Sequence, residues 1–274
     1  MRLKDVSRFF DKTTARDAYG SATFKCQLDP LDLFRTEGTR IKLRTMTTAP
    51  EVILPPRRVI LIDGQRYLVS DGSKDHWNGE ALRTRYVLQG ADHLVSIRSI
   101  AQLLANTAGT DAYASIDFNK YSTDERDSSE YHPQYHIFFG GGETVPENSI
   151  LTTATGFYLV RNAYRTPAGL IDALSNQLDS PVTDAATFAS RTYDPITDTY
   201  SDASSTVRCV RVRWQDSFAY LSQGSTKYER GDVQAFVPLS VTPKAGDKIT
   251  LADGAWTILS VVTSEHHSLH LRRA

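Results

Sequence analysis

The chain of 274 residues contains two short segments that resemble each other, one near each end. Residues 22–26 read Ala-Thr-Phe-Lys-Cys, and residues 205–209 read Ser-Thr-Val-Arg-Cys. Each segment is followed by strand-rich sequence and by an apolar run into an Asp-Gly pair, at Asp63-Gly64 and at Asp253-Gly254. Internal repetition of this kind predicts duplicated small modules. It favours a protein that works through its surfaces and its assembly over an enzyme built around a single pocket.

Both ends of the chain read as β-structure. An apolar run from Val59 to Ile62, the pair Asp63-Gly64 and a second run from Tyr67 to Val69 predict a hairpin, because Asp-Gly suits the two positive φ angles of a type I′ turn. Residues 205–274 contain about five strand-like runs, which is enough to close a small barrel or sandwich. We therefore expect a mainly β protein with a small β-barrel or sandwich module at each end.

The middle of the chain has a different pattern and predicts a mixed α+β region. Apolar residues recur at helical spacing in 92–106, with Asp92 as a possible cap, and again in 166–178, where Thr166 and Pro167 suit a helix start. Polar stretches on either side read as loops or linkers. The expected parts are 1–91, an N-terminal arm and the first β-barrel; 92–204, a mixed α+β insertion or diverged third module; and 205–274, the second β-barrel.

Composition limits the partners and the compartment. The 31 basic and 32 acidic residues give a net charge of -1, which argues against a protein that grips nucleic acid through its phosphates, although Arg208, Arg211 and Arg213 form a local basic stripe. Cys26 and Cys209 occupy matching positions of the repeat and are expected to be buried core residues, not a disulfide. With no signal peptide and no run of about 18 apolar residues, we expect a soluble protein made in a cytoplasm, without a membrane partner.

Candidate sites for chemistry have simpler interpretations. Gly140-Gly141-Gly142 follows a strand but lacks the Lys-Ser/Thr of a phosphate-binding loop, so a flexible turn is favoured. The histidines form two groups, His132 with His136, and His266 and His267 with His270. A solvated histidine patch is favoured over a metal site, because no carboxylate or cysteine completes a ligand set. We expect no enzymatic activity, no catalytic residues, no metal and no cofactor.

Aromatic residues in polar stretches are the best candidates for contacts with other proteins. Residues 70–82 read as a projecting loop, in which Trp77 either packs back on its own strand or is held out as a contact. A docking helix or arm is expected at the N-terminus, and a second polar loop at 110–134. The interface candidates are Lys74, His76, Trp77, Tyr121, Tyr131, Phe9 and Phe10.

One segment of the last module carries a family resemblance. Residues 245–262 read Ala-Gly-Asp-Lys-Ile-Thr-Leu-Ala-Asp-Gly-Ala-Trp-Thr-Ile-Leu-Ser-Val-Val, and residues 268–273 end the chain as Ser-Leu-His-Leu-Arg-Arg before Ala274. A Gly-Asp before a strand, a short turn, an aromatic return strand and a basic final strand resemble the head-tail joining proteins of tailed bacteriophages, also called stopper or head-closure proteins. The resemblance covers about the last 70 residues, and residues 21–91 repeat it loosely.

The resemblance implies a structural protein of the virion neck, assembled in the host cytoplasm. Members of that family form homo-oligomeric rings between the portal or adaptor and the tail terminator or tail tube, and they continue or close the channel through which viral DNA passes. Two modules per chain would suit a sixfold or twelvefold ring. Three alternatives stay open: a tail terminator, a tail-associated adhesion or carbohydrate-binding protein, and a hydrolase that uses carboxylates.

Overall fold

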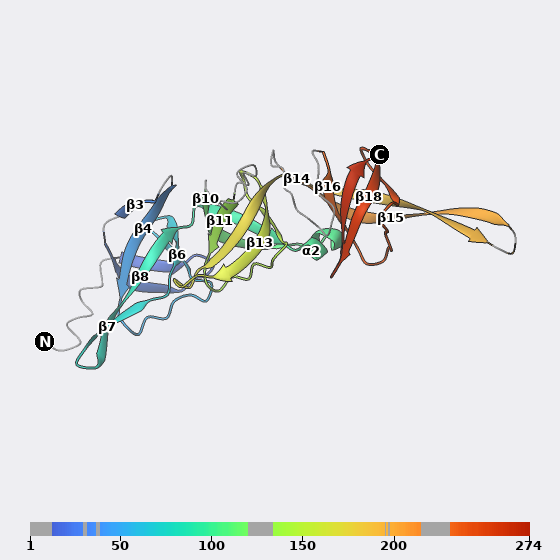
Figure 1. Ribbon diagram of the computed structural model, residues 1–274. Coiled ribbons are helices and arrows are strands. Elements are labelled where there is room, and N and C mark those ends of the chain that lie inside the picture. The colour runs from blue at the N-terminus through green and yellow to red at the C-terminus, as the bar shows by residue number, and fades with distance from the viewer. Residues whose placement is uncertain are drawn as a thin grey trace.

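The computed structural model describes residues 13–29, 32–36, 39–119, 134–194, 196, 198–214 and 231–274. The protein is mainly β, as the sequence predicts, and consists of three closed six-stranded barrels that lie in a row (Figure 1). A β-barrel is thus present at each end of the row, and a third one stands where a mixed α+β region was expected.

The barrels are numbered in chain order. Barrel 1 contains β1 (Thr13–Asp17), β2 (Thr23–Leu28), β4 (Thr39–Thr48), β5 (Val59–Ile62), β6 (Gln65–Val69) and β8 (Glu80–Gly90). Barrel 2 contains β9 (His93–Arg98), β10 (Thr110–Asn119), β11 (Gln134–Phe139), β12 (Ile150–Thr152), β13 (Phe157–Arg165) and β14 (Ile171–Asp194). Barrel 3 uses β14 again, with β15 (Thr199–Trp214), β16 (Val233–Val237), β17 (Lys248–Leu251), β18 (Gly254–Thr263) and β19 (His267–Arg273). Outside the barrels lie β3 (Asp32–Thr36), β7 (Ser73–Trp77) and the helix α2 (Ile100–Ala105).

All three barrels have the same strand order. If the six strands of a barrel are called a to f in chain order, they pair around the barrel as a-b-c-f-e-d, and every pairing is antiparallel. Strand d lies beside strand a, so strands a to d form a Greek key whose c–d connection crosses one end of the barrel. From the strand bounds, this connection is ten residues long in each barrel: 49–58, 140–149 and 238–247.

The c–d connections also share their hydrogen bonds. In each one, the residue before strand d donates its N–H to the carbonyl three residues earlier, and its own carbonyl accepts an N–H from strand e. The three residues are Arg58, Ser149 and Asp247. Val145 and Val241 of two connections are buried against the cores of their own barrels. The middle of the chain is therefore a third, diverged copy of the module.

The three cores repeat the same contacts. On the inner wall, an aromatic residue of strand e faces an aliphatic residue of strand d, in the pairs Ile60–Tyr67, Leu151–Tyr158 and Ile249–Trp256. The pairing of strands b and c places Cys26, Ala114 and Cys209 at equivalent positions, and none of the three is exposed. Both cysteines are free, so the prediction of buried core thiols is confirmed.

Of the two helices predicted for the middle region, the first is present only in part and the second is wrong. Residues 93–98 form β9, and only 100–105 are helical, behind a capping box in which Ser99 and Gln102 bond to each other's backbone N–H. The second predicted helix, 166–178, is the turn before β14 and the first part of that strand.

The stretches predicted as loops contain strands. The turn that ends at Gly64 is a type I′ hairpin as expected, with φ of 50° at Asp63 and 79° at Gly64. Residues 73–90, however, form a second hairpin, β7–β8, and 110–119 form β10. The expected linker within 179–204 is the paired part of β14 and β15. Their polar composition concealed these strands.

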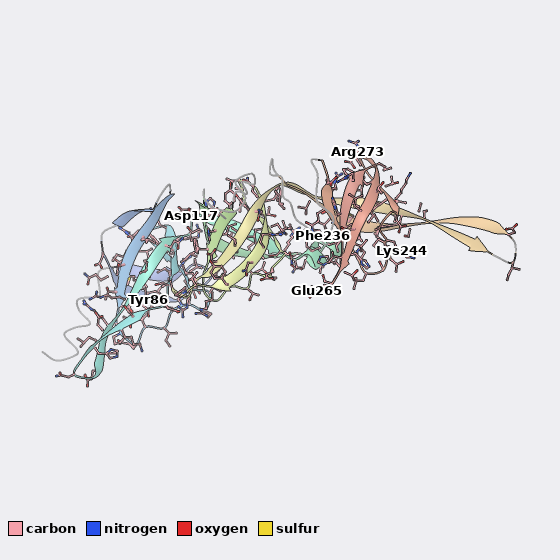
Figure 2. All side chains as sticks on the ribbon, viewed as in Figure 1. Tyr86, Asp117, Phe236, Lys244, Glu265 and Arg273 are labelled. Atoms are coloured by element: carbon pink, nitrogen blue, oxygen red, sulfur yellow. The ribbon has the colours of Figure 1, made fainter. Side chains whose placement is uncertain are left out.

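The two junctions between barrels bury the same positions. Each uses the first residue of strand d, its partner on strand e and one residue at the end of the e–f pairing. These are Val59, Leu68 and Ala91 of barrel 1, and Ile150, Leu159 and Leu178 of barrel 2. All six are at most 2% exposed. In the following barrel they meet a phenylalanine of strand c at equivalent positions, Phe138 in the first junction and Phe236 in the second. Phe236 is labelled in Figure 2.

The a–b connection of the preceding barrel completes each junction. In the first junction, the backbone N–H of Tyr113 donates to the Tyr19 hydroxyl at 2.7 Å. In the second, Arg208 donates to the carbonyl of Leu103 at 2.9 Å and to the Asn106 side chain at 3.0 Å, at the C-terminal end of α2. Tyr113 and Arg208 occupy equivalent positions on strand b. Arg208 therefore stabilises a helix end, where a cation is favourable.

A partly buried ion pair and two glycines hold barrel 1 against barrel 2. Arg57 donates to both carboxylate oxygens of Glu143, at 2.6 and 2.7 Å, and the Glu143 side chain is only 4% exposed. A Cβ atom at Gly140 would lie 1.9 Å from the Arg57 carbonyl oxygen, and one at Gly142 would lie 1.9 Å from the Pro56 carbonyl oxygen. The glycine run is thus a close contact between two connections, and not the free, flexible turn expected from the sequence.

Gly140→Ala is expected to destabilise the protein by about 1–3 kcal/mol, because the new methyl group overlaps backbone that cannot move without opening the junction. The measurement is the thermal melting temperature. Gly156→Ala is the control, since its Cβ would meet the flexible end of Gln177 at 3.2 Å. Equal melting temperatures for the two variants would contradict the close contact.

The two thiols are expected to be unreactive in the folded protein. Burial raises the pKa of Cys26 to about 11 and that of Cys209 to about 12, so little thiolate forms at pH 8 and neither sulfur reaches solvent. A disulfide reagent should label no thiol per native chain and both after denaturation. Rapid labelling of the native protein would show that a barrel opens.

Candidate functional site

The two ends of the row differ from the junctions inside it. In barrel 3, Lys248 and Thr257 occupy the two positions that hold the apolar d–e pair in barrels 1 and 2. Ala274 occupies the remaining junction position, at the end of the e–f pairing. Lys248 and Ala274 are exposed. We call these three residues the outgoing face of barrel 3. No apolar pair is present there to bury a further barrel.

The opposite end, on barrel 1, is polar and basic. The strand b and c positions that receive the preceding barrel in barrels 2 and 3 correspond in barrel 1 to Lys25, Gln27 and Thr47. On the adjacent β8, Arg85 and Val87 also point outward and are exposed. We call Lys25, Arg85, Val87 and their neighbours the incoming face of barrel 1. Strands β3 and β4 mark this end of the row in Figure 1.

A long β-hairpin extends from barrel 3 and was missed by sequence reasoning. Strand β14 leaves the barrel after Phe188, and β15 re-enters it at Ser205; between them, 189–194 pair with 199–204. We call residues 189–204 the arm. It projects along the axis of the row, away from the other barrels (Figure 1). Ile196, at its tip, is 92% exposed. The arm is rich in Ser, Thr and Asp, a composition typical of linkers. The signal that indicates strands in a sequence is a regular alternation of β-branched residues.

The predicted contact residues fall into two groups. Lys74 and His76 are exposed on β7, and Trp77 ends that strand at the tip of the β7–β8 hairpin. The candidates Tyr121, Tyr131, Phe9 and Phe10 lie outside the described residues. The role of all seven as contacts stays a prediction.

The base of the β7–β8 hairpin is stabilised by charge. Asp75 accepts a hydrogen bond from Arg83 and lies 3.0 Å from Arg85. The hydrogen bond from Arg83 is the main cause that lowers the pKa of Asp75.

A histidine–carboxylate cluster lies on the outer wall of barrel 2. The Nδ1 atom of His136 is 2.9 Å from Oδ2 of Asp172, which also accepts a hydrogen bond from the Tyr164 hydroxyl at 2.8 Å. The Asp172 side chain is only 4% exposed. The hydrogen bond to Asp172 raises the pKa of His136, although burial opposes the shift, and the charges of Asp172 and Asp117 add to it. Because His136 stacks on Phe138, the cluster borders the first junction.

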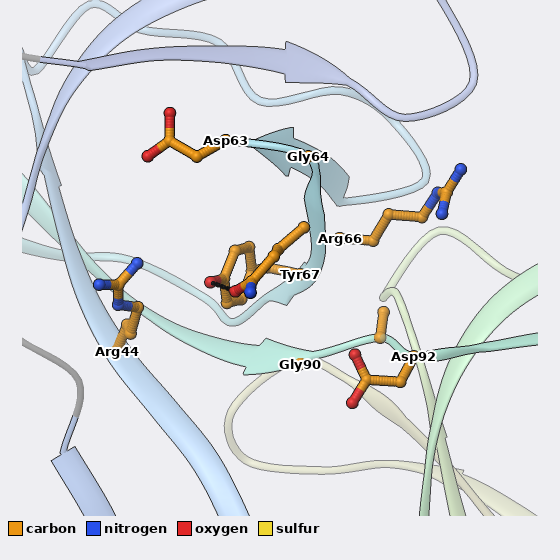
Figure 3. A pocket seen from close by; sticks show the side chains of 9 residues that line it. Arg44, Asp63, Gly64, Arg66, Tyr67, Gly90 and Asp92 are labelled. Atoms are coloured by element: carbon orange, nitrogen blue, oxygen red, sulfur yellow. Dashed lines mark hydrogen bonds between the residues drawn. The ribbon is translucent and has the colours of Figure 1, made fainter.

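A cavity of about 470 Å³ opens beside the β5–β6 turn (Figure 3). It is lined by Arg44, Asp63, Gly64, Gln65, Arg66, Tyr67, Gly90, Ala91 and Asp92. Its two arginines and two aspartates balance in charge, and the Tyr67 hydroxyl donates to the Gln65 side chain at 2.7 Å. The side chains that line the cavity include no serine, cysteine or histidine that a carboxylate could activate as a nucleophile.

The C-terminal histidines are not the solvated patch expected from the sequence. His270 is fully buried, with Nε2 2.6 Å from Oδ2 of Asp232, whose carboxylate also accepts two hydrogen bonds from Arg272. His267 is 9% exposed and bonds Thr263 through Nδ1 at 2.8 Å. These residues join strands of barrel 3.

Part of the basic stripe is also structural. Arg211 lies 2.6 Å from the carboxylate of Asp253, and Arg208 contacts α2 as described above. The charge of Arg211 is therefore compensated within the chain, and the guanidinium of Arg208 is held at the end of α2 by neutral acceptors.

Within the described ranges, no group of three or more His, Cys, Asp or Glu side chains is placed to bind a metal ion. Of the helical residues that the structure describes, none belongs to a helix long and apolar enough to cross a bilayer. Comparison with protein-family models, with curated proteins and with solved structures found no match.

The His136–Asp172 pair is expected to make stability depend on pH. Because the folded state raises the pKa of His136, the pair stabilises the fold fully below pH 6.5, the ordinary value, and this stabilisation is lost as the pH rises through the raised pKa. The melting temperature of the wild type, measured between pH 5.5 and 8.5, should fall across that window relative to that of His136→Asn. His76→Asn, at an exposed site, should keep the wild-type profile; a His136→Asn profile parallel to the wild type would refute the coupling.

Proposed function

We propose that the chain is a structural subunit of the neck of a tailed bacteriophage. In this role, copies of the chain assemble into a ring that joins the portal or adaptor to the tail and continues the DNA channel. The ring contains six or twelve copies, and its other partners are the tail terminator or tail tube protein. The chain acts by holding other proteins in position and catalyses no reaction.

The observation that carries the proposal is the threefold repeat with its two equivalent junctions. Each junction buries apolar residues and hydrogen-bonded polar groups, so three barrels form one elongated body instead of independent domains. Such a body has two unlike ends, which suit head-to-tail packing of copies around a closed ring. The resemblance of residues 245–273 to head-tail joining proteins points to the same use.

The charge of the chain is compatible with a channel. With a net charge of -1, the chain has little overall electrostatic attraction for DNA. A channel through which DNA moves must not bind the DNA tightly. An adhesion protein would instead present aromatic side chains to a ligand. Trp256 is 1% exposed in the core of barrel 3 and cannot serve in that way.

The proposal is tested by the mass and shape of the purified full-length chain. Native mass spectrometry should give six or twelve copies, and negative-stain electron microscopy should show rings with a central opening. A monomer at the highest soluble concentration, in salt that matches the virion interior, would overturn the proposal. The matched control is the chain in dilute denaturant, which should lose rings before it loses its β-structure.

A further inference from the structure

We propose that the arm of barrel 3 in one copy of this chain docks on the incoming face of barrel 1 in the next copy. This inference rests on the proposed ring and names the surfaces by which neighbouring copies meet. The contact is head-to-tail, because it joins two different patches, and it closes into a ring if successive rotations return to the first copy.

The first reason is the place of the arm in the repeat. The a–b connection of barrel 1, through Tyr19, and that of barrel 2, through α2, both pack against the following barrel. The arm is the a–b connection of barrel 3, and no barrel follows it within the residues that the structure describes. By position, the arm is therefore the element that would meet a following barrel, and another copy supplies one.

The second reason is the form of the arm. Among the described residues of the arm, 189–194 pair with 199–204 and with no other strand. A two-stranded hairpin is marginally stable in water unless it packs against something else. The 92% exposure of Ile196 places a large apolar side chain at the tip, where contact with a partner would bury it.

The third reason is the match of charge and polarity between the two surfaces. The arm contains one arginine, Arg191, against three aspartates, Asp194, Asp198 and Asp202. Two of these flank Ile196. The incoming face has the reverse arrangement: Val87, which is 47% exposed, lies on the same strand as Arg83 and Arg85, and Lys25 is nearby on β2.

The incoming face keeps an excess of basic residues after its internal ion pairs are taken into account. Asp75 and the exposed Asp29 offset two of the three cations Lys25, Arg83 and Arg85, so the face keeps a net positive charge. The side chains of Arg83 and Arg85 are 42% and 47% exposed and can take a second carboxylate. The outgoing face is polar at Lys248 and Thr257, so it offers no apolar pair for a fourth junction, whereas the arm carries the exposed apolar side chain of Ile196.

Charge reversal tests the contact. Asp194→Lys/Asp198→Lys on the arm, and Lys25→Glu/Arg85→Glu on the incoming face, should each raise the concentration at which half of the chains assemble by roughly tenfold or more, because like charges then face each other. A chain with all four substitutions should assemble like the wild type. The control is Glu51→Lys/Glu147→Lys, which makes the same charge change at two exposed sites elsewhere and should have no effect.

Cross-linking tests the geometry with independent variants. A chain with Ile196→Cys, mixed with a chain with Val87→Cys, should give a cross-linked dimer with a short bis-maleimide, since Cys26 and Cys209 are buried. The matched control replaces Val87→Cys by Leu239→Cys, at a site 52% exposed on barrel 3, and should give none. Cross-links in the Ile196→Cys chain alone would mean that arms meet arms, which overturns the proposal.

The outcomes separate this inference from the proposed function. If the wild type forms rings that persist with the arm charges reversed and give no 196–87 cross-link, the ring stands and the arm binds a different neighbour, so the inference fails. If the wild type stays monomeric, both fail. Loss of assembly in each reversed pair, with recovery in the fourfold variant, supports the head-to-tail contact.

Discussion

The structure depends on one cross-strand pair, the first residue of strand d with its neighbour on strand e. In barrels 1 and 2 this pair is apolar, Val59 with Leu68 and Ile150 with Leu159, and it packs outward against the next barrel. The adjacent residues of the same strands point inward and build the core, so the hairpin serves two hydrophobic clusters. In barrel 3 the pair is Lys248 with Thr257. The polar pair gives barrel 3 no apolar patch for an equivalent junction and resembles the polar outer face of a capping repeat in other repeat proteins.

The second constraint is the sharing of a strand. β14 is strand f of barrel 2, strand a of barrel 3 and one side of the arm, over 24 residues. At about 3.3 Å per residue it can run roughly 80 Å. A flexible linker would leave the arm free to point in many directions. The direction of this arm is instead fixed by two barrels, which reduces the conformational entropy that a contact at its tip would cost.

The sequence predicted the ends of this row better than its middle. The match between 22–26 and 205–209 agrees with the strand pairing residue by residue, whereas the two Asp-Gly pairs are displaced by one position, since Ala252-Asp253 occupies the turn that Asp63-Gly64 occupies in barrel 1. A third copy was only one of two expectations for the middle region, because Ala114 stands where the other copies have cysteine. The false helix at 166–178 has a physical cause: Ala173 faces the core of barrel 2 and Leu178 faces the junction, so both sides of β14 bury apolar groups and the alternation typical of a strand is lost.

The near-neutral composition conceals an uneven distribution of charge. Apolar contact is used where two barrels belong to one chain, whereas basic residues outnumber acidic ones on the incoming face and acidic residues outnumber basic ones on the arm. An apolar contact between two barrels of one chain is buried during folding and does not lower the solubility of the folded protein. The same apolar surface exposed at an end of the row would make copies of the chain associate non-specifically, before they reach the correct ring geometry. Charged ends keep the folded subunit soluble and associate reversibly. In the assembly proposed above, this separation lets each copy fold completely first and then select its neighbour by charge and by the single apolar group at the arm tip.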